Sequence, residues 1–321
     1  MFKYTLKKLL AMIPKFLAIT VFLFVLLEIS PGDPLTRMVD PETYADMTPH
    51  MMEEYRESLG LNRPAVIRYF SWLGGLLQGD FGYSMSARMP IADLVADRLP
   101  FSMELQFATL VLSGFIGVAL GFLCAVFKRT PIDYLSSGIS AFGISLPEYF
   151  WALGFMIIFG ITLNWFPTGG RMPTDIENPT LWQRLPYMVL PVSAMVFHMF
   201  CSLTRQTRST MIDVMNKDYI KTARSKGLPE SVVNVKHCLR NSMTPIMTML
   251  VMRLPRLIGG SIVIEQVFNY IGIGAMTVAA SQNLDTPVVL FNITLTATMT
   301  LVASTLIDIL TAALDPRVRF E

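Results

Sequence analysis

The chain has 321 residues, of which 52% are hydrophobic and only 16% are charged. An ordinary soluble domain carries about 25% charged residues, so this composition predicts a protein with several membrane-spanning segments. A formal net charge of +2 is too small to suggest a surface that binds nucleic acid. The three cysteines show no Cys-x-x-Cys spacing, which argues against a disulfide or a zinc site.

Near the N-terminus, a mostly apolar run extends from Leu9 to Ile29 and follows Lys3, Lys7 and Lys8. The run is long enough to cross a bilayer, which takes about 20 residues. No small-x-small cleavage site follows it, so we expect an uncleaved first transmembrane helix rather than a secretory signal.

Apolar runs predict six membrane spans in an all-α protein. They lie near 9–30, 105–127, 135–163, 186–204, 243–268 and 288–314. The third run is interrupted at Pro147, where we expect a kink or a boundary. The expected organisation is a first helix (1–30), an extracytoplasmic loop (31–100), a core of five helices (101–314) and a cytoplasmic tail (315–321).

The distribution of basic residues predicts the orientation. The segment from Arg205 to Arg240 contains eight Lys and Arg residues against three acidic ones, whereas the loop from Gln266 to Pro287 contains no Lys or Arg. Because cytoplasmic loops are enriched in Lys and Arg, both ends of the chain are expected in the cytoplasm.

The first outer loop has apolar residues at helical spacing between Pro49 and Leu77. This spacing predicts one or two short helices, separated at Gly60 to Pro64. The loop is expected to cap the outer mouth of the bundle.

Between the fourth and fifth spans, the basic segment from Asp218 to Pro229 predicts a short helix near 216–228. Gly227 is expected to end it, and Pro229 to be the first residue of a second helix. Ala223 and Gly227 are four residues apart, and they predict a smooth patch on which another protein docks closely. The alternative is a solvated basic loop of the kind found in any polytopic protein.

These residues resemble the cytoplasmic coupling loop of permease subunits from binding-protein-dependent ABC importers. That family carries a Glu-Ala-Ala, three residues, Gly signature, to which Lys221, Thr222, Ala223 and Gly227 correspond. The departures at Lys221 and Thr222, like the later His237-x-Leu-Arg, resemble the variant of the dipeptide, oligopeptide and nickel branch. Further similarities, each weak alone, follow in the family's order: Pro31-Gly32-Asp33-Pro34, Gly79 to Ser84, Leu163 to Gly170, Gly259 to Glu265, Gly272-Ile273-Gly274 and Leu314 to Arg319.

The resemblance implies a pore subunit, in the bacterial or archaeal cytoplasmic membrane, that catalyses no bond change. The implied partners are a second, similar permease, two P-loop ATPases that bind ATP and Mg²⁺, and an extracytoplasmic solute-binding protein. An ATPase subunit is expected to grip the short helix. The residues expected to serve this coupling are Tyr219, Lys221, Thr222, Ala223, Arg224, Lys226 and Gly227.

Two arginines at membrane depth, Arg253 and Arg256, are three residues apart on one helix face. Since a central Arg costs about 2.5–3.5 kcal/mol on insertion scales, both are expected to face the bundle interior, a water path or a partner. One interpretation is a cavity wall that contacts the carboxylates of a passing peptide. The other is pairing with an acidic residue, for which the candidates are Glu148, Glu104 and Asp308.

Metal ligation is not expected. His198 lies in the fourth span, and no second histidine is near it in the sequence. The 22 methionines are explained by flexible apolar packing.

The resemblance implies a di- or oligopeptide as the cargo, with nickel or oligosaccharide as alternatives within the same family. The chain contains no Gly-x-x-x-x-Gly-Lys-Ser/Thr motif, so it is not expected to bind ATP through a P-loop. A secondary transporter driven by ions would be expected to show paired halves or acid-lined broken helices. A membrane-embedded enzyme would need a polar catalytic cluster, and none is visible in the sequence.

Overall fold

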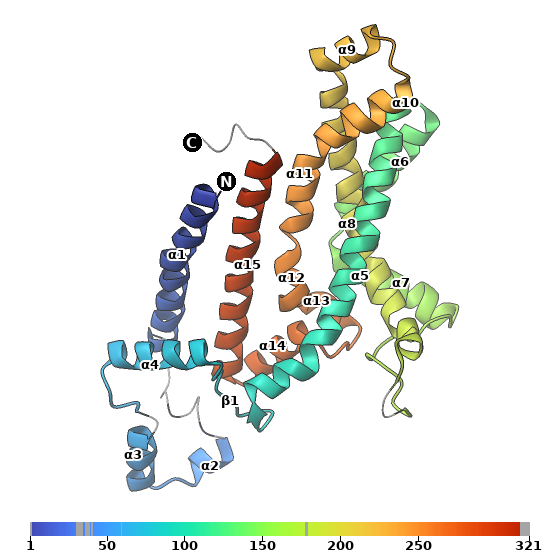
Figure 1. The fold of residues 1–321 in the computed structure, drawn as a ribbon. Helices are drawn as coiled ribbons and strands as arrows, with labels where there is room; N and C mark the ends of the chain where they lie inside the picture. Colours follow the sequence, from blue (N-terminus) through green and yellow to red (C-terminus); the bar gives the residue numbers. More distant parts are fainter. Residues whose placement is uncertain are drawn as a thin grey trace.

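The computed structural model describes residues 2–29, 35, 39, 41–58, 60–176 and 179–314. It consists almost entirely of helices (Figure 1). In chain order the elements are α1 (Phe2–Ile29), α2 (Pro41–Ala45), α3 (Pro49–Ser58), α4 (Ala65–Gln78), β1 (Tyr83–Ser84), β2 (Met89–Pro90), α5 (Ile91–Val126), α6 (Pro131–Ser145), α7 (Glu148–Phe155), the π-helix η2 (Met156–Thr162), α8 (Leu181–Met215), α9 (Asp218–Ser225), α10 (Glu230–Val232), the π-helix η3 (Val233–Leu239), α11 (Arg240–Val251), α12 (Leu254–Gly259), α13 (Ile262–Val267), α14 (Ile273–Gln282) and α15 (Thr286–Leu314).

Within the described ranges, α1, α5, α8 and α15 are each long and apolar enough to cross a membrane. The segment from α6 to η2 is a fifth candidate, bent by 100°. The bend lies at Pro147, as the sequence predicts. Leu146 before it is extended (φ −107°, ψ 142°), because the proline ring disfavours helical geometry in the preceding residue.

The predicted fifth span, 243–268, is not one continuous helix but is divided among α11, α12 and α13. Pro255 lies in the first turn of α12, where its lack of an N–H group costs little. Gly260 then ends α12 with φ at +68°, a backbone conformation that L-residues rarely adopt.

Helix α5 begins at Ile91, within the segment 31–100 that was predicted as an extracytoplasmic loop with short helices. Ile91, Leu94 and Val95 are buried against residues of α14 and α15, which include Ile273 and Val288. This distant packing stabilises an amphipathic extension that the apolar run alone does not reveal.

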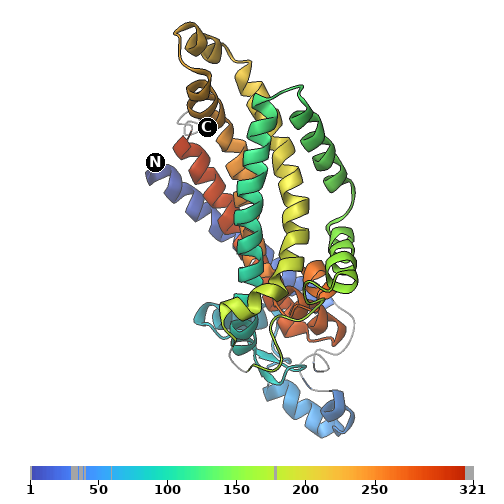
Figure 2. The ribbon, with the colours of Figure 1, turned by 90° about the vertical axis from the view of Figure 1, so that its right-hand side faces the viewer.

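The centre of the bundle is the pair α5 and α8, which run side by side in both views (Figures 1 and 2). A Cβ atom on Gly117 would lie 2.5 Å from Leu203 Cβ, and one on Gly121 would lie 2.5 Å from Thr207 Cβ. These glycines therefore permit a helix separation that no larger residue would allow.

Between α1 and α5, the helices α3 and α4 confirm the prediction of one or two short helices, with Gly60 (φ +66°) in the turn between them. A small antiparallel pair, β1 and β2, follows. Asp285, just before α15, accepts hydrogen bonds from the hydroxyls of Ser84 (2.6 Å) and Ser86 (2.7 Å), and so holds this hairpin to the start of α15.

Helix α1 begins, and α15 ends, at the end of the molecule that also carries α9, whereas α2, α3 and α4 lie at the opposite end (Figure 1). An ion pair between Lys8 and Asp308 (2.8 Å) joins α1 to α15. The similarities noted at 31–34 and the predicted tail at 315–321 lie outside the described residues.

Candidate functional site

Helix α9 projects from one end of the bundle (Figure 1). Its inner face is fixed by Ile220 and Ala223, which are buried against Met211 of α8 and against Val233 and Cys238 of η3. Burial raises the pKa of the Cys238 thiol. The helix is thus a rigid extension of the bundle rather than a loose loop.

The prediction that Ala223 forms part of an exposed docking patch with Gly227 is wrong. Ala223 is only 7% exposed because its methyl group fills the contact with α8 and η3, whereas Gly227 is exposed. The outward surface consists of the other predicted coupling residues: Tyr219, Lys221, Thr222, Arg224 and Lys226.

Gly227 follows α9, as predicted, and has φ at +77°. A Cβ atom at this position would meet nothing within 4 Å, so the requirement for glycine comes from the backbone conformation alone. Pro229 is the N-cap of the following helix rather than its first helical residue.

Two ion pairs shape the charge of this surface. Lys221 lies 2.8 Å from Asp218, and its hydrogen bond lowers the pKa of that carboxyl. Arg224 Nε donates to Glu230 Oε1 at 2.9 Å, across the Gly227 turn. Lys226 forms no ion pair with any residue that the structure describes, and it leaves a free positive charge at the end of α9.

Three features near α9 escaped the sequence analysis. Leu228 and Val235 are exposed apolar residues beside the helix, and apolar positions in an otherwise polar segment were the available signal. Asp133 of α6 is 3% exposed at its side chain and accepts from Arg208 Nε of α8 at 2.5 Å. No sequence pattern links these two residues, which are 75 positions apart.

Arg253, the N-cap of α12, and Arg256, within α12, both line one small pocket of about 20 Å³. Of the three candidate partners, Glu148 lies 3.8 Å from Arg256. Glu104 instead pairs with Arg184 (2.9 Å), and Asp308 pairs with Lys8 as described above.

His198, Gln106 and Thr109 also line this pocket, which makes it a polar patch among apolar helices. Nδ1 of His198 is buried and has no hydrogen-bond partner in the described part of the chain. No group of three or more His, Cys, Asp or Glu side chains suited to a metal ion occurs among the described residues.

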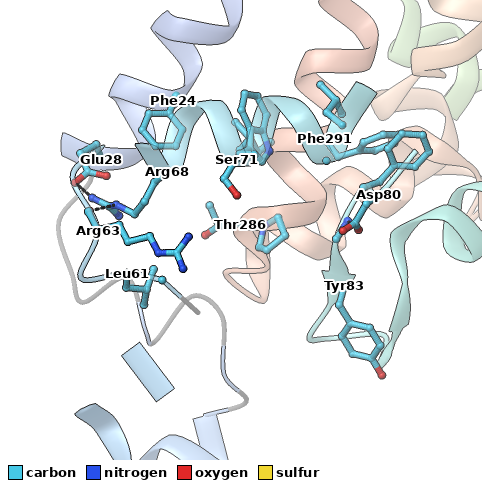
Figure 3. A pocket seen from close by; sticks show the side chains of 18 of the residues that line it. Phe24, Glu28, Leu61, Arg63, Arg68, Ser71, Asp80, Tyr83, Thr286 and Phe291 are labelled. Atoms are coloured by element: carbon cyan, nitrogen blue, oxygen red, sulfur yellow. Dashed lines mark hydrogen bonds and ion pairs between the residues drawn. The ribbon is translucent and has the colours of Figure 1, made fainter. Parts of the chain in front are cut away.

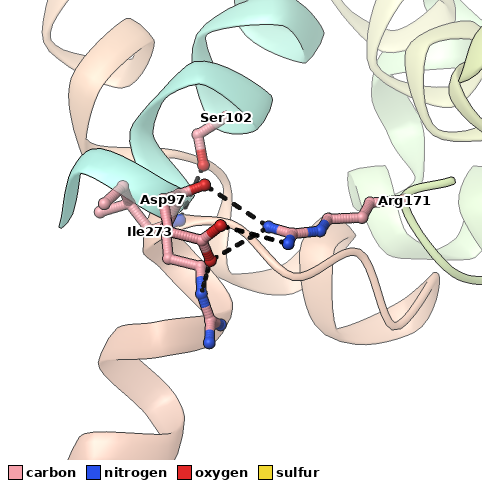
Figure 4. A network of polar contacts seen from close by, with 5 residues as sticks. Asp97, Ser102, Arg171 and Ile273 are labelled. Atoms are coloured by element: carbon pink, nitrogen blue, oxygen red, sulfur yellow. Dashed lines mark hydrogen bonds and ion pairs between the residues drawn. The ribbon is translucent and has the colours of Figure 1, made fainter. Parts of the chain in front are cut away.

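At the other end of the bundle, the fully buried carboxylate of Glu265 joins three helices. It accepts hydrogen bonds from Ser102 Oγ of α5 (2.9 Å), from the backbone N–H of Ser261 (3.1 Å) and from that of Ala275 in α14 (2.9 Å). Ser102 Oγ in turn accepts from the N–H of Ile273 at 2.8 Å (Figure 4). We call this group the Glu265 network.

Glycines bring the Glu265 network together. A Cβ atom on Gly260 would lie 2.3 Å from Glu265 Oε1, and one on Gly272 would lie 2.3 Å from Ser102 Oγ. Gly260 belongs to the motif from Gly259 to Glu265, and Gly272 to the motif Gly272-Ile273-Gly274. Both motifs are therefore explained by close approach of the backbone to the Glu265 carboxylate and its partner Ser102. Beside the network, Arg171 pairs with Asp97 of α5 at 3.3 Å (Figure 4).

Residues 117–320 match the family of binding-protein-dependent transport system inner membrane components, and residues 1–106 match the N-terminal segment of such components. The oligopeptide transport system permease protein AppB of Bacillus subtilis is 36% identical, with 99% of each chain covered. The glutathione transport system permease protein GsiC of Escherichia coli K12 is 34% identical, with 100% of each chain covered. A putative peptide permease of Brucella suis is also 34% identical, with 99% of each chain covered.

Among solved structures, an amino acid ABC transporter crystallised with histidines has a chain that is similar in fold. The TM-score is 0.51 at 16% sequence identity, with 69% of this chain and 94% of that chain covered. At this identity the likeness describes the fold alone.

Proposed function

The chain belongs to the family of inner-membrane components of binding-protein-dependent transport systems, and from this premise we propose that it forms half of the translocation pore of an ATP-driven peptide importer. It is a multi-pass protein of the cytoplasmic membrane. The observation that carries the proposal is the full-length similarity to permease subunits named for oligopeptides, peptides and glutathione. Those names favour a peptide cargo over nickel or oligosaccharide, and the dependence on a binding protein argues against transport driven by an ion gradient.

In this proposal the chain crosses the membrane six times, with both ends in the cytoplasm. The fifth crossing in chain order is made by α11 and α12 together, and the sixth by α15. The common location of α9, the start of α1 and the end of α15 supports this orientation, because basic segments then lie on one side. A second, similar permease completes the pore, two ATPases bind ATP and Mg²⁺, and a solute-binding protein delivers the peptide.

We assign the contact with an ATPase subunit to the outward surface of α9. Tyr219, at 49% exposure, supplies an apolar ring, and Lys226 supplies an unpaired charge. Since Ile220 and Ala223 fix the inner face to α8 and η3, a force on α9 is transmitted to the bundle rather than absorbed by a flexible loop.

The pocket lined by Arg253 and Arg256 is the proposed contact for peptide carboxylates. The nearest acid, Glu148, lies 3.8 Å from Arg256, which is too long for a strong charge-assisted hydrogen bond and leaves the guanidinium able to bind an anion. Replacement of Arg256 by Gln is expected to raise the KM for peptide uptake while replacement by Lys has a smaller effect, and an unchanged KM for both variants would remove the pocket from the pathway.

The experiment that tests the assembly is purification of the tagged chain from gently solubilised native membranes, followed by mass spectrometry. A second permease and P-loop ATPases are expected to accompany it. A bifunctional cross-linker at a cysteine replacing Thr222, which is exposed on α9, is expected to link the chain to an ATPase. If the chain repeatedly purifies alone, with no ATPase in any mild detergent, the proposal fails.

A further inference from the structure

Helix α4 contacts α1 within the apolar stretch of α1, which fixes the position of α4 relative to the hydrocarbon layer of the membrane. The hydroxyls of Tyr69 and Thr20 are 2.9 Å apart, and the rings of Tyr69 and Phe24 have centroids 5.5 Å apart. Thr20 and Phe24 both belong to the apolar stretch of α1, residues 3–26. At 1.5 Å per residue, Thr20 lies roughly 9 Å before the end of that stretch, so the side of α4 that packs on α1 reaches the edge of the hydrocarbon layer.

The axis of α4 runs across α1 and α15 rather than along them (Figure 1). A helix in this position lies in the plane of the membrane when α1 and α15 cross it.

One exposed face of α4 is apolar. Val66 is 66% exposed, Phe70 63% and Leu77 72%, and their spacing of four and seven residues places them on one helix face. We call these three residues the outer stripe.

The polar side chains of α4 lie on a different face. Arg68 and Ser71 line a pocket of about 450 Å³ beneath the helix, where Arg68 pairs with Glu28 at the end of α1 (Figure 3). Arg63, in the turn before α4, extends its guanidinium into the same pocket. The helix therefore has one apolar face, one face that carries Arg68 and Ser71 over this pocket, and an inner edge on α1.

We propose that α4 is an interfacial helix whose outer stripe inserts among the acyl chains of the outer membrane leaflet. Near the end of α1, Phe22 and Leu26 are exposed apolar residues as well, and the stripe contains no charged residue. Helices with one apolar and one polar face lie in this way at the boundary between headgroups and acyl chains. The leaflet assignment rests on the proposed function and orientation, whereas the depth of α4 rests on its contacts with α1.

The anchored helix has a consequence for the outer loop. Because α4 is bound to lipid on one side and to α1 on another, α2 and α3 before it and the β1–β2 hairpin after it are attached to a fixed point at the membrane surface. The outer mouth of the bundle is then held at a constant height above the bilayer.

The test places a nitroxide on single cysteines introduced into the complete complex, reconstituted in phospholipid vesicles. The native Cys124, Cys201 and Cys238 are fully buried, so an exposed introduced cysteine is labelled selectively. Collision of the label with oxygen, which concentrates in lipid, is compared with collision with a water-soluble nickel chelate. Phe70→Cys and Leu77→Cys report the outer stripe, and Ser71→Cys and Gln78→Cys are matched controls on the polar side of the same helix.

Labels at positions 70 and 77 are expected to collide several-fold more with oxygen than with the nickel chelate, and labels at 71 and 78 are expected to show the reverse. Equal access to the chelate at all four positions would overturn the proposal, since the stripe would then face water. Loss of access to both reagents at 70 and 77 would also overturn it, because a protein partner would then cover the stripe.

Orientation is measured separately, with a membrane-impermeant thiol reagent applied to His50→Cys on α3 and Thr222→Cys on α9. Modification of position 50 from the outside only is expected. Modification of position 50 from the inside only would refute the leaflet assignment and the proposed orientation together, while the collision data would still decide whether α4 lies in lipid. ATP-driven uptake by the same vesicles tests the proposed function independently.

Discussion

The Glu265 network provides the sharpest prediction from the geometry. The carboxylate is fully buried, and it accepts hydrogen bonds from Ser102, Ser261 and Ala275. The substitution Glu265→Gln keeps the shape of the side chain but replaces one acceptor oxygen with an NH₂ group, which has no lone pair to offer.

The expected loss follows from which donors then face the NH₂ group. If the NH₂ group replaces Oε1, Ser102 and Ser261 lose their acceptor; if it replaces Oε2, only Ala275 does. The second orientation is therefore the less costly one, and a hydrogen bond to a charged group contributes about 1.5–3 kcal/mol. Because the donor that is left stays buried, the loss is expected at the upper end, about 3 kcal/mol, which corresponds to roughly a hundredfold in an opening equilibrium.

Hydrogen–deuterium exchange with mass spectrometry measures this effect locally. Peptides that cover α13 and α14 are expected to exchange about a hundredfold faster in the variant, while peptides that cover α9 stay unchanged. The matched control is Glu230→Gln, the same substitution at an exposed carboxylate paired with Arg224, where about 0–1 kcal/mol is expected. Unchanged exchange in α13 and α14, or acceleration spread evenly over the chain, would refute the assignment of a local structural role to Glu265.

Three further predictions concern the end of the molecule that carries α9. Gly227→Val forces a β-branched residue to φ near +77°, a strain of about 1–2 kcal/mol, and is expected to leave ATP hydrolysis intact while peptide uptake falls. The control is Gly138→Val, at a position that is open and has no positive φ. Normal uptake by the Gly227 variant would contradict the coupling role. Arg208→Met leaves the buried carboxylate of Asp133 unpaired and is expected to destabilise the chain by about 3–5 kcal/mol in thermal unfolding. Most of this loss is expected to be recovered when Asp133→Asn is added. A double variant no more stable than the single one would show that the pair is not the cause. Burial raises the pKa of Cys238, so its thiolate forms at a higher pH than that of a free thiol. In the folded chain, modification by N-ethylmaleimide is therefore expected only at such a higher pH. Rapid labelling of the folded chain near neutral pH would show that η3 opens.

Local sequence features predicted those parts of the fold that local chemistry determines. Pro147 bends the third apolar run, Gly60 separates the two helices of the outer loop, and Gly227 ends α9 with a positive φ. In each case one residue restricts its own backbone or that of its neighbour, so no knowledge of the packing was needed.

Features that depend on residues far apart in the chain were not predictable. The start of α5 at Ile91 depends on burial against Val288, almost 200 positions later. The inward direction of Ala223 depends on how η3 returns beneath α9, which helical spacing alone does not specify. The Glu265 network likewise became visible only when α5, α13 and α14 were placed together, although its glycines were noted as motifs.

The central proposal is that this chain conducts peptides in an assembly driven by ATP. Uptake of a labelled oligopeptide into proteoliposomes that contain the purified assembly tests this claim most directly, with the binding protein outside and ATP and Mg²⁺ inside. Uptake is expected only when both ATP and the binding protein are present. Uptake that continues without ATP and follows an imposed ion gradient would contradict the account.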